Sequence, residues 1–238
     1  MKNLNKQFHL NCCAFKECCC SDIYLTTFLK NEGVIHNEIL IELAANYPKF
    51  DQSGETTWDF IITNVEQKIR TIGLVDSVFL PYKEAKELEN KITINPDKVL
   101  ESLVVRGKMT PFIRDQANMI LNTIKTSSTS DASILLSGFV SRIAARNDVS
   151  FNDKVILIGA AEVGIFSNLF WNSALNDNTN PYHKVALSHN ESGTLRKIKW
   201  ADVIGAVVGG LLGSGAGPVV AVGLGISLGT FASSVFDR

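Results

Sequence analysis

The most restrictive feature of this 238-residue chain is its C-terminal end, where no charged residue and no histidine occurs from Val203 to Phe236. Glycine recurs there at every fourth position, and the spacing resumes after Pro218: Gly205, Gly209, Gly213, Gly217, Gly225 and Gly229. Four residues advance an α-helix by about 400°, so these glycines form a slowly winding stripe without side chains. Such a stripe lets another helix approach backbone to backbone.

The glycine content makes this segment an unfavourable helix in water. Nine glycines lie between residues 201 and 238, and each costs about 1 kcal/mol relative to alanine inside a helix. An isolated solvated helix is marginal even for good helix formers, so it cannot recover a total of about 9 kcal/mol. The stripe is therefore expected to pack closely against another segment, or to lie where water does not compete for the backbone.

A turn signal at Gly215-Ala216-Gly217-Pro218 divides the segment into two arms, 201–215 and 219–236. At 1.5 Å per residue the arms would be about 22 and 27 Å long, against a hydrocarbon core of about 30 Å. The first arm follows basic and aromatic residues of the kind that anchor a membrane interface: Arg196, Lys197, Lys199 and Trp200. We expect a helical hairpin with both ends on one side of a membrane, and a hairpin buried inside a soluble helical protein is the alternative.

The 201–236 segment resembles the glycine-zipper hydrophobic segments of bacterial membrane-active proteins, including bacteriocin-like peptides. A helical domain with a hydrophobic hairpin near the C-terminus is also similar in outline to the pore-forming domain of colicins. The resemblance covers only the tail. It implies a soluble form that shields the hairpin and a membrane form that releases it.

Apolar residues recur at helical spacing along much of the remaining chain, which predicts a mostly α, bundle-like protein. Polar caps and prolines mark several helix starts. Helices are expected over 34–46, 57–72 and 83–91, from 95–97, from 110–111 to about 125, from Asp131 to about 146, and over 153–175. A polar linker is expected at 126–130, and a polar loop from 177 to 195.

The predicted helix over 153–175 is the most apolar of these. Because it is apolar on nearly all faces, it is expected to be either the centre of a bundle or a further membrane segment. We expect Glu162, its lone charge after Lys154, to lie at the helix edge and reach solvent, since a buried unpaired carboxylate is costly. The chain is thus divided into a cysteine-rich segment (1–21), an α-helical domain (22–195) and a glycine-zipper hairpin (196–238).

All five cysteines of the chain lie in one short segment: Cys12, Cys13, Cys18, Cys19 and Cys20. A disulfide framework would distribute them along the chain, so this cluster does not predict one. Crowded thiolates are ligands for a soft metal such as Cu(I) or Zn²⁺, although the spacing is not that of a structural zinc site. Acylation or redox sensing is a second reading of the cluster, and thiols without a specific role are a third.

The remaining sequence excludes several classes of function. It holds no nucleophile elbow, metalloprotease motif, phosphate-binding loop or dinucleotide fingerprint, so we expect no enzyme and no cofactor. The net charge of −1 gives no electrostatic case for binding nucleic acid. The N-terminal ten residues lack the apolar core of a secretory signal, so we expect cytoplasmic synthesis followed by membrane association.

Two hypotheses follow for function. In the first, the chain is a membrane-active or membrane-anchored helical protein, such as a bacterial toxin or effector, whose tail inserts into lipid or forms a homo-oligomer. In the second, it is a soluble interaction or scaffold protein whose hairpin is buried in its own core or against a partner helix.

Overall fold

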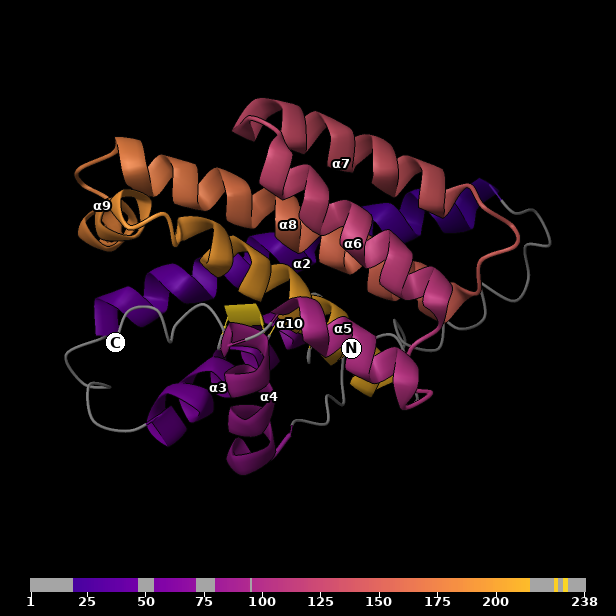
Figure 1. Ribbon diagram of the computed structural model, residues 1–238, viewed down its shortest axis with the longest axis horizontal. Helices are drawn as coiled ribbons and strands as arrows, with labels where there is room; N and C mark the ends of the chain where they lie inside the picture. Colours follow the sequence, from indigo (N-terminus) through magenta and orange to yellow (C-terminus); the bar gives the residue numbers. More distant parts are fainter. Residues whose placement is uncertain are drawn as a thin grey trace.

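The computed structural model describes residues 19–46, 54–71, 80–94, 96–214, 225–226 and 229–230 (Figure 1). These residues confirm the predicted mostly α fold, because they form helices and no strand. The helices are α2 (Cys19–Asn46), α3 (Gly54–Thr71), α4 (Tyr82–Ile94), α5 (Pro96–Val105), α6 (Pro111–Thr126), α7 (Thr129–Ala144), α8 (Phe151–Asn176), α9 (His183–Glu191) and α10 (Leu195–Ser214).

Helix α8 is the centre of the bundle, with α2, α6, α7 and α10 packed around it (Figure 1). Its residues 154–165 are buried without interruption. Gly164 marks the crossing point of three neighbours: a methyl group added there would lie 3.1 Å from Ile124 of α6, 3.2 Å from Val203 of α10 and 3.5 Å from Leu136 of α7. The all-round apolar surface of α8 suits this position, since neighbouring helices cover residues 154–165 on every side.

The starts of α3 to α8 agree with the predicted ones to within a few residues, and side-chain caps mark three of them. Thr110 caps α6 as predicted, and its hydroxyl accepts a hydrogen bond from the Ile113 amide. Helices α7 and α8 are capped by Ser128 and Ser150, whose hydroxyls accept from amides three residues later. Serine followed three residues on by an acid satisfies the first amides of a helix, so most of the predicted linker at 126–130 is helical.

The predicted loop from 177 to 195 was wrong, because it contains α9. A second, smaller apolar cluster holds this region in place. Tyr182 packs edge-on against Phe170 and Trp171, and its hydroxyl donates to the Leu40 carbonyl at 2.9 Å. Leu195, the first residue of α10, is buried in the same cluster. Helix α2 also begins 15 residues before the predicted position, at Cys19.

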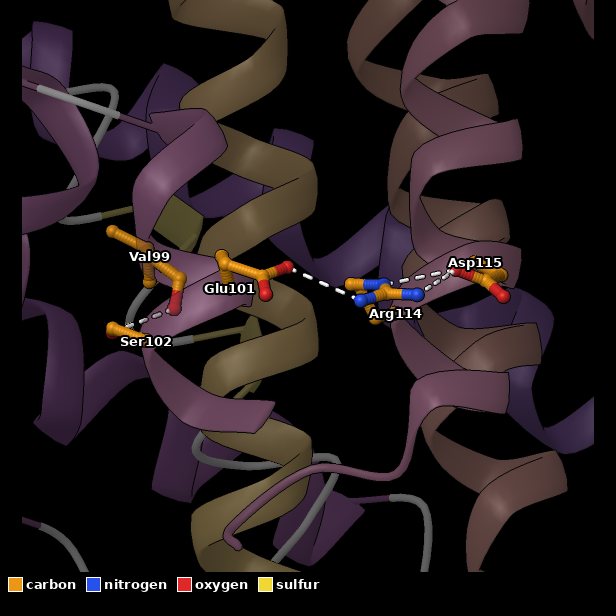
Figure 2. Close-up of polar contacts among 5 residues, drawn as sticks. All are labelled: Val99, Glu101, Ser102, Arg114 and Asp115. Atoms are coloured by element: carbon orange, nitrogen blue, oxygen red, sulfur yellow. Dashed lines mark hydrogen bonds and ion pairs between the residues drawn. The ribbon is translucent and has the colours of Figure 1, made fainter. Parts of the chain in front are cut away.

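Polar contacts between the outer helices lie at the surface. The Arg114 guanidinium of α6 contacts the carboxylates of Glu101 on α5, at 3.2 Å, and of its neighbour Asp115, at 2.7 Å (Figure 2). In the same view, the Ser102 hydroxyl donates to the Val99 carbonyl one turn back, at 2.8 Å. Solvated ion pairs of this kind contribute little, so the bundle depends on its apolar centre.

Candidate functional site: a buried polar seam beside the glycines

The glycines of the predicted zipper are buried wherever the structure describes them. Gly205, Gly209 and Gly213 lie on α10, Gly225 and Gly229 are buried too, and Gly217 lies outside the described residues. A methyl group added at Gly225 would lie 3.2 Å from the Ala206 carbonyl oxygen, and one added at Gly229 only 2.9 Å from that of Asp202. Two glycines four residues apart therefore pack directly on the α10 backbone, which is itself buried from 201 to 210.

The other neighbour of Gly225 is a carboxylate from α2. A methyl group added at Gly225 would lie 2.5 Å from Glu32 Oε1, and one added at Gly159 of α8 would overlap Glu32 Oε2. Glu32 is only 3% exposed, and no donor among the described residues hydrogen-bonds to its carboxylate. The carboxylate thus fits into space that is free because Gly159 of α8 and Gly225 of the tail have no side chains.

This environment disfavours a charge on Glu32. Burial raises the pKa of its carboxyl well above the usual value, and the nearby charge of Glu162 raises it further. The expectation that Glu162 reaches solvent was wrong, because its side chain is 8% exposed. Helix α2 crosses α8 at this point: a methyl group added at Gly33 would lie 2.6 Å from the Glu162 carbonyl oxygen.

One turn further along α2, His36 faces Asp202 of α10. His36 Nε2 lies 3.2 Å from Asp202 Oδ1, close enough for an ion pair but not aligned for a hydrogen bond, and both side chains are 0% exposed. Asp202 Oδ2 accepts a hydrogen bond from Ser167 of α8 at 2.5 Å and a longer one from Trp171 at 3.4 Å. Burial, the largest single influence, lowers the pKa of His36, but the Asp202 carboxylate and a hydrogen bond between His36 Nδ1 and Asn37 Oδ1 at 3.0 Å together outweigh it, so the pKa lies above its usual value.

The predicted membrane-interface anchors have different environments. Arg196 and Lys197 are exposed on the first turn of α10, and Trp200 is half-buried. Lys199 instead points into the bundle, where Nζ donates to Asn168 Oδ1 at 2.7 Å. Burial lowers the pKa of Lys199 to about 8, although the charge of Asp202 opposes the shift.

We call the buried polar side chains between α2, α8 and α10 the polar seam: Glu32, His36, Ser167 and Asp202. The seam contains the side-chain types of a hydrolytic triad in an arrangement that does not activate a nucleophile. Asp202 lies between the other two, so the Ser167 hydroxyl donates to a carboxylate and not to the imidazole of His36. In a working triad the imidazole removes the proton of the hydroxyl. All three side chains are also 0% exposed, which leaves no access for a substrate.

Metal-binding residues do not gather in the described part of the chain. No group of three or more His, Cys, Asp or Glu side chains suited to a metal ion occurs there. The structure places the backbone of Cys19 and Cys20 in the first turn of α2, whereas Cys12, Cys13 and Cys18 lie outside the described residues. Metal binding or acylation at the cysteines therefore stays a prediction.

Two surface grooves lie away from the seam. One, of about 380 Å³, runs between α2 and α3 and is lined by Glu38, Glu42 and Lys68. The Lys68 ammonium lies 2.8 Å from the first carboxylate and 2.9 Å from the second. The other, of about 460 Å³, is an open groove beside Met119 and Leu135 on α6 and α7.

Sequence reasoning missed the seam although a signal for it was present. Glu32 and His36 stand four residues apart among the buried positions of α2, in step with Leu29, Leu40 and Leu43. Ionisable residues at core positions of a helical pattern indicate a buried polar site. The predicted helix began at residue 34, so Glu32 was outside it and the pattern was not visible.

No family model, curated protein or solved structure matches this chain. By length and composition, α8 is the one helix within the described residues that could cross a membrane, and most of it is buried inside the bundle. The core helix of a soluble protein has the same properties.

Proposed function

We propose that this chain is a latent membrane-active protein, a helical bundle that keeps its most apolar segments covered until they meet lipid. One observation carries the proposal: α8 and the buried part of α10, the two most apolar segments described, pack against each other at the centre of the molecule. The surrounding helices α3 to α6 are amphipathic and turn their apolar sides inward.

The dimensions of the inner helices suit this role. With 26 residues, α8 is about 39 Å long at 1.5 Å per residue, which exceeds a hydrocarbon core of about 30 Å. Residues 203–214 of α10 carry no charge. Arg196 and Lys197 are exposed just before this apolar part, where basic side chains would contact anionic headgroups.

Flotation with vesicles of phosphatidylcholine and phosphatidylglycerol tests the proposal on the full-length chain. We expect the protein to float with the vesicles, and the double variant Arg196→Glu/Lys197→Glu to bind at least about tenfold more weakly, because each basic residue near an anionic surface contributes about 1 kcal/mol. The matched control is Arg106→Glu/Lys108→Glu, an exposed pair in the α5–α6 connection, which should bind like the wild type. A full-length protein that stays at the bottom of the gradient for every vesicle composition would refute the proposal.

A second candidate is a soluble interaction or scaffold protein with a permanently buried tail. The close packing of Gly225 and Gly229 on α10 favours it, since the glycines already have a partner inside the chain. This candidate predicts a protein that is monodisperse without detergent and releases no dye from vesicles. Removal of residues 201–238 should then expose apolar surface and cause aggregation.

A further inference from the structure

Glu32 and His36 lie four residues apart on the inner face of α2, and each faces α10 or the glycines packed upon it. Glu32 fits between Gly159 of α8 and Gly225, and His36 pairs with Asp202 beside Gly229. We propose that these two side chains form a pH-sensitive lock between α2, α8 and α10, which holds the bundle closed in mildly acidic solution and loosens it as the pH rises. The lock does not depend on the membrane activity proposed above.

The surroundings of Glu32 accept a neutral carboxyl more readily than a carboxylate. Its oxygens face two glycines and no described hydrogen-bond donor. The nearest charge identified is Glu162 of α8, which is negative. An ionised carboxylate that no described group compensates is costly in such a buried place, so deprotonation favours any motion that opens the space between α2, α8 and Gly225.

The ion pair between His36 and Asp202 also makes the closed bundle less stable as the pH rises. While His36 is protonated, its charge compensates that of Asp202 in a place that water does not reach. When His36 loses its proton, the buried Asp202 loses that counter-charge, and among the described residues it keeps the hydrogen bonds from Ser167 and Trp171 and the charge of Lys199. A buried ion pair that loses one charge becomes strongly unfavourable.

The direction in which the stability of the closed bundle changes with pH follows from the linkage between proton binding and folding. A group whose pKa is raised in the folded state stabilises that state below its unfolded pKa, and the stabilisation is lost as the pH rises through the folded pKa. The pKa of Glu32 is raised from 4.5 and that of His36 from 6.5. Both groups therefore make the closed bundle less stable as the pH rises, Glu32 from about 4.5 upward and His36 from about 6.5 upward.

Other charged groups near the lock do not reverse this sign in that range. On α10, Lys199 has its pKa lowered to about 8 from 10.5, so its opposite contribution falls between these values. Among the described residues, the helices packed against α2 also carry Glu162, which is balanced in part by Lys30 of α2, and outward-facing charges on α3 and α7: Lys68, paired with Glu38 and Glu42, and the exposed Asp131 and Arg142.

Hydrogen exchange of α10 amides from pH 5 to pH 8 tests the lock, using protection factors that are corrected for intrinsic exchange. In the wild type we expect the opening constant to rise with pH, by up to tenfold per unit for each proton released. Glu32→Gln keeps the side chain neutral, so its opening constant should change less with pH and be smaller than that of the wild type at pH 8. The matched control, Glu38→Gln, changes a half-exposed carboxylate of the same helix and should retain the wild-type pH dependence.

A second measurement uses only the wild type. An NMR titration of the wild-type imidazoles, with His36 assigned by through-bond correlation to its own backbone, should give His36 an apparent pKa above 6.5. The lock is overturned if the wild-type opening constant is flat or falls between pH 5 and pH 8, or if His36 titrates at or below 6.5. It is also overturned if a folded Glu32→Gln has the wild-type opening constant at every pH.

Discussion

The two faces of α2 carry the same kinds of side chain and use them differently. On the outer face, Glu38 and Glu42 share the Lys68 ammonium of α3 at the edge of a groove, where water reaches all three. On the inner face, Glu32 has no basic partner among the described residues, and His36 pairs with Asp202 at 0% exposure. Water can replace the outer contacts when they break, whereas it cannot reach the inner ones. Burial, more than residue type, therefore decides which charged side chains affect the stability of this bundle.

The largest effect is expected for Asp202→Ala, which removes the acceptor at the centre of the inner face. The variant leaves the buried His36 without its counter-charge and the hydroxyl of Ser167 without its acceptor. Breaking a buried ion pair by removing one partner costs about 3–5 kcal/mol. Urea unfolding followed by tryptophan fluorescence at pH 6 measures the loss. A loss below about 1 kcal/mol would mean that the inner pair behaves like a surface pair.

A smaller effect is expected for Gly229→Ala, which tests the close approach of the tail to α10. The added methyl group would lie 2.9 Å from the Asp202 carbonyl oxygen, and overpacking of this kind costs about 1–3 kcal/mol. Gly138→Ala on α7 is the matched control, because its methyl group would meet only Arg142, at 3.4 Å. That control should stabilise the protein by up to about 1 kcal/mol, through helix propensity. Equal effects of the two variants on the unfolding midpoint would contradict the close packing at Gly229.

Much of the fold could be predicted from the sequence because it depends on local signals. The apolar spacing of α3 and the Thr110 cap of α6 are each contained within a few neighbouring residues. Helix α9 was missed because its position depends on Tyr182 packing against Phe170 and bonding to Leu40, which is 142 residues away in the chain. No local pattern contains such a contact.

The candidate site could be predicted only in part, and for the same reason. The glycine spacing predicted a zipper along Gly205, Gly209 and Gly213, which stays a prediction, whereas the close contacts with the α10 backbone that the structure describes are those of Gly225 and Gly229. The sequence did not indicate that the side chains beside them would be Glu32 and His36, which precede them by more than 180 positions. Which helix covers a glycine stripe is decided by the packing of the whole bundle.

The smallest effect is expected on the outer face of α2, where Glu42→Gln removes one of the two carboxylates around Lys68. The ammonium keeps its contact with Glu38 at 2.8 Å, and the Glu42 side chain is 41% exposed, so solvent replaces most of what is lost. We expect a loss of at most about 0.5 kcal/mol in urea unfolding, which should shrink further in 1 M salt, since exposed ion pairs are weak and screened. An effect as large as that of Asp202→Ala would show that the groove between α2 and α3, and not the inner seam, holds α2 on the bundle.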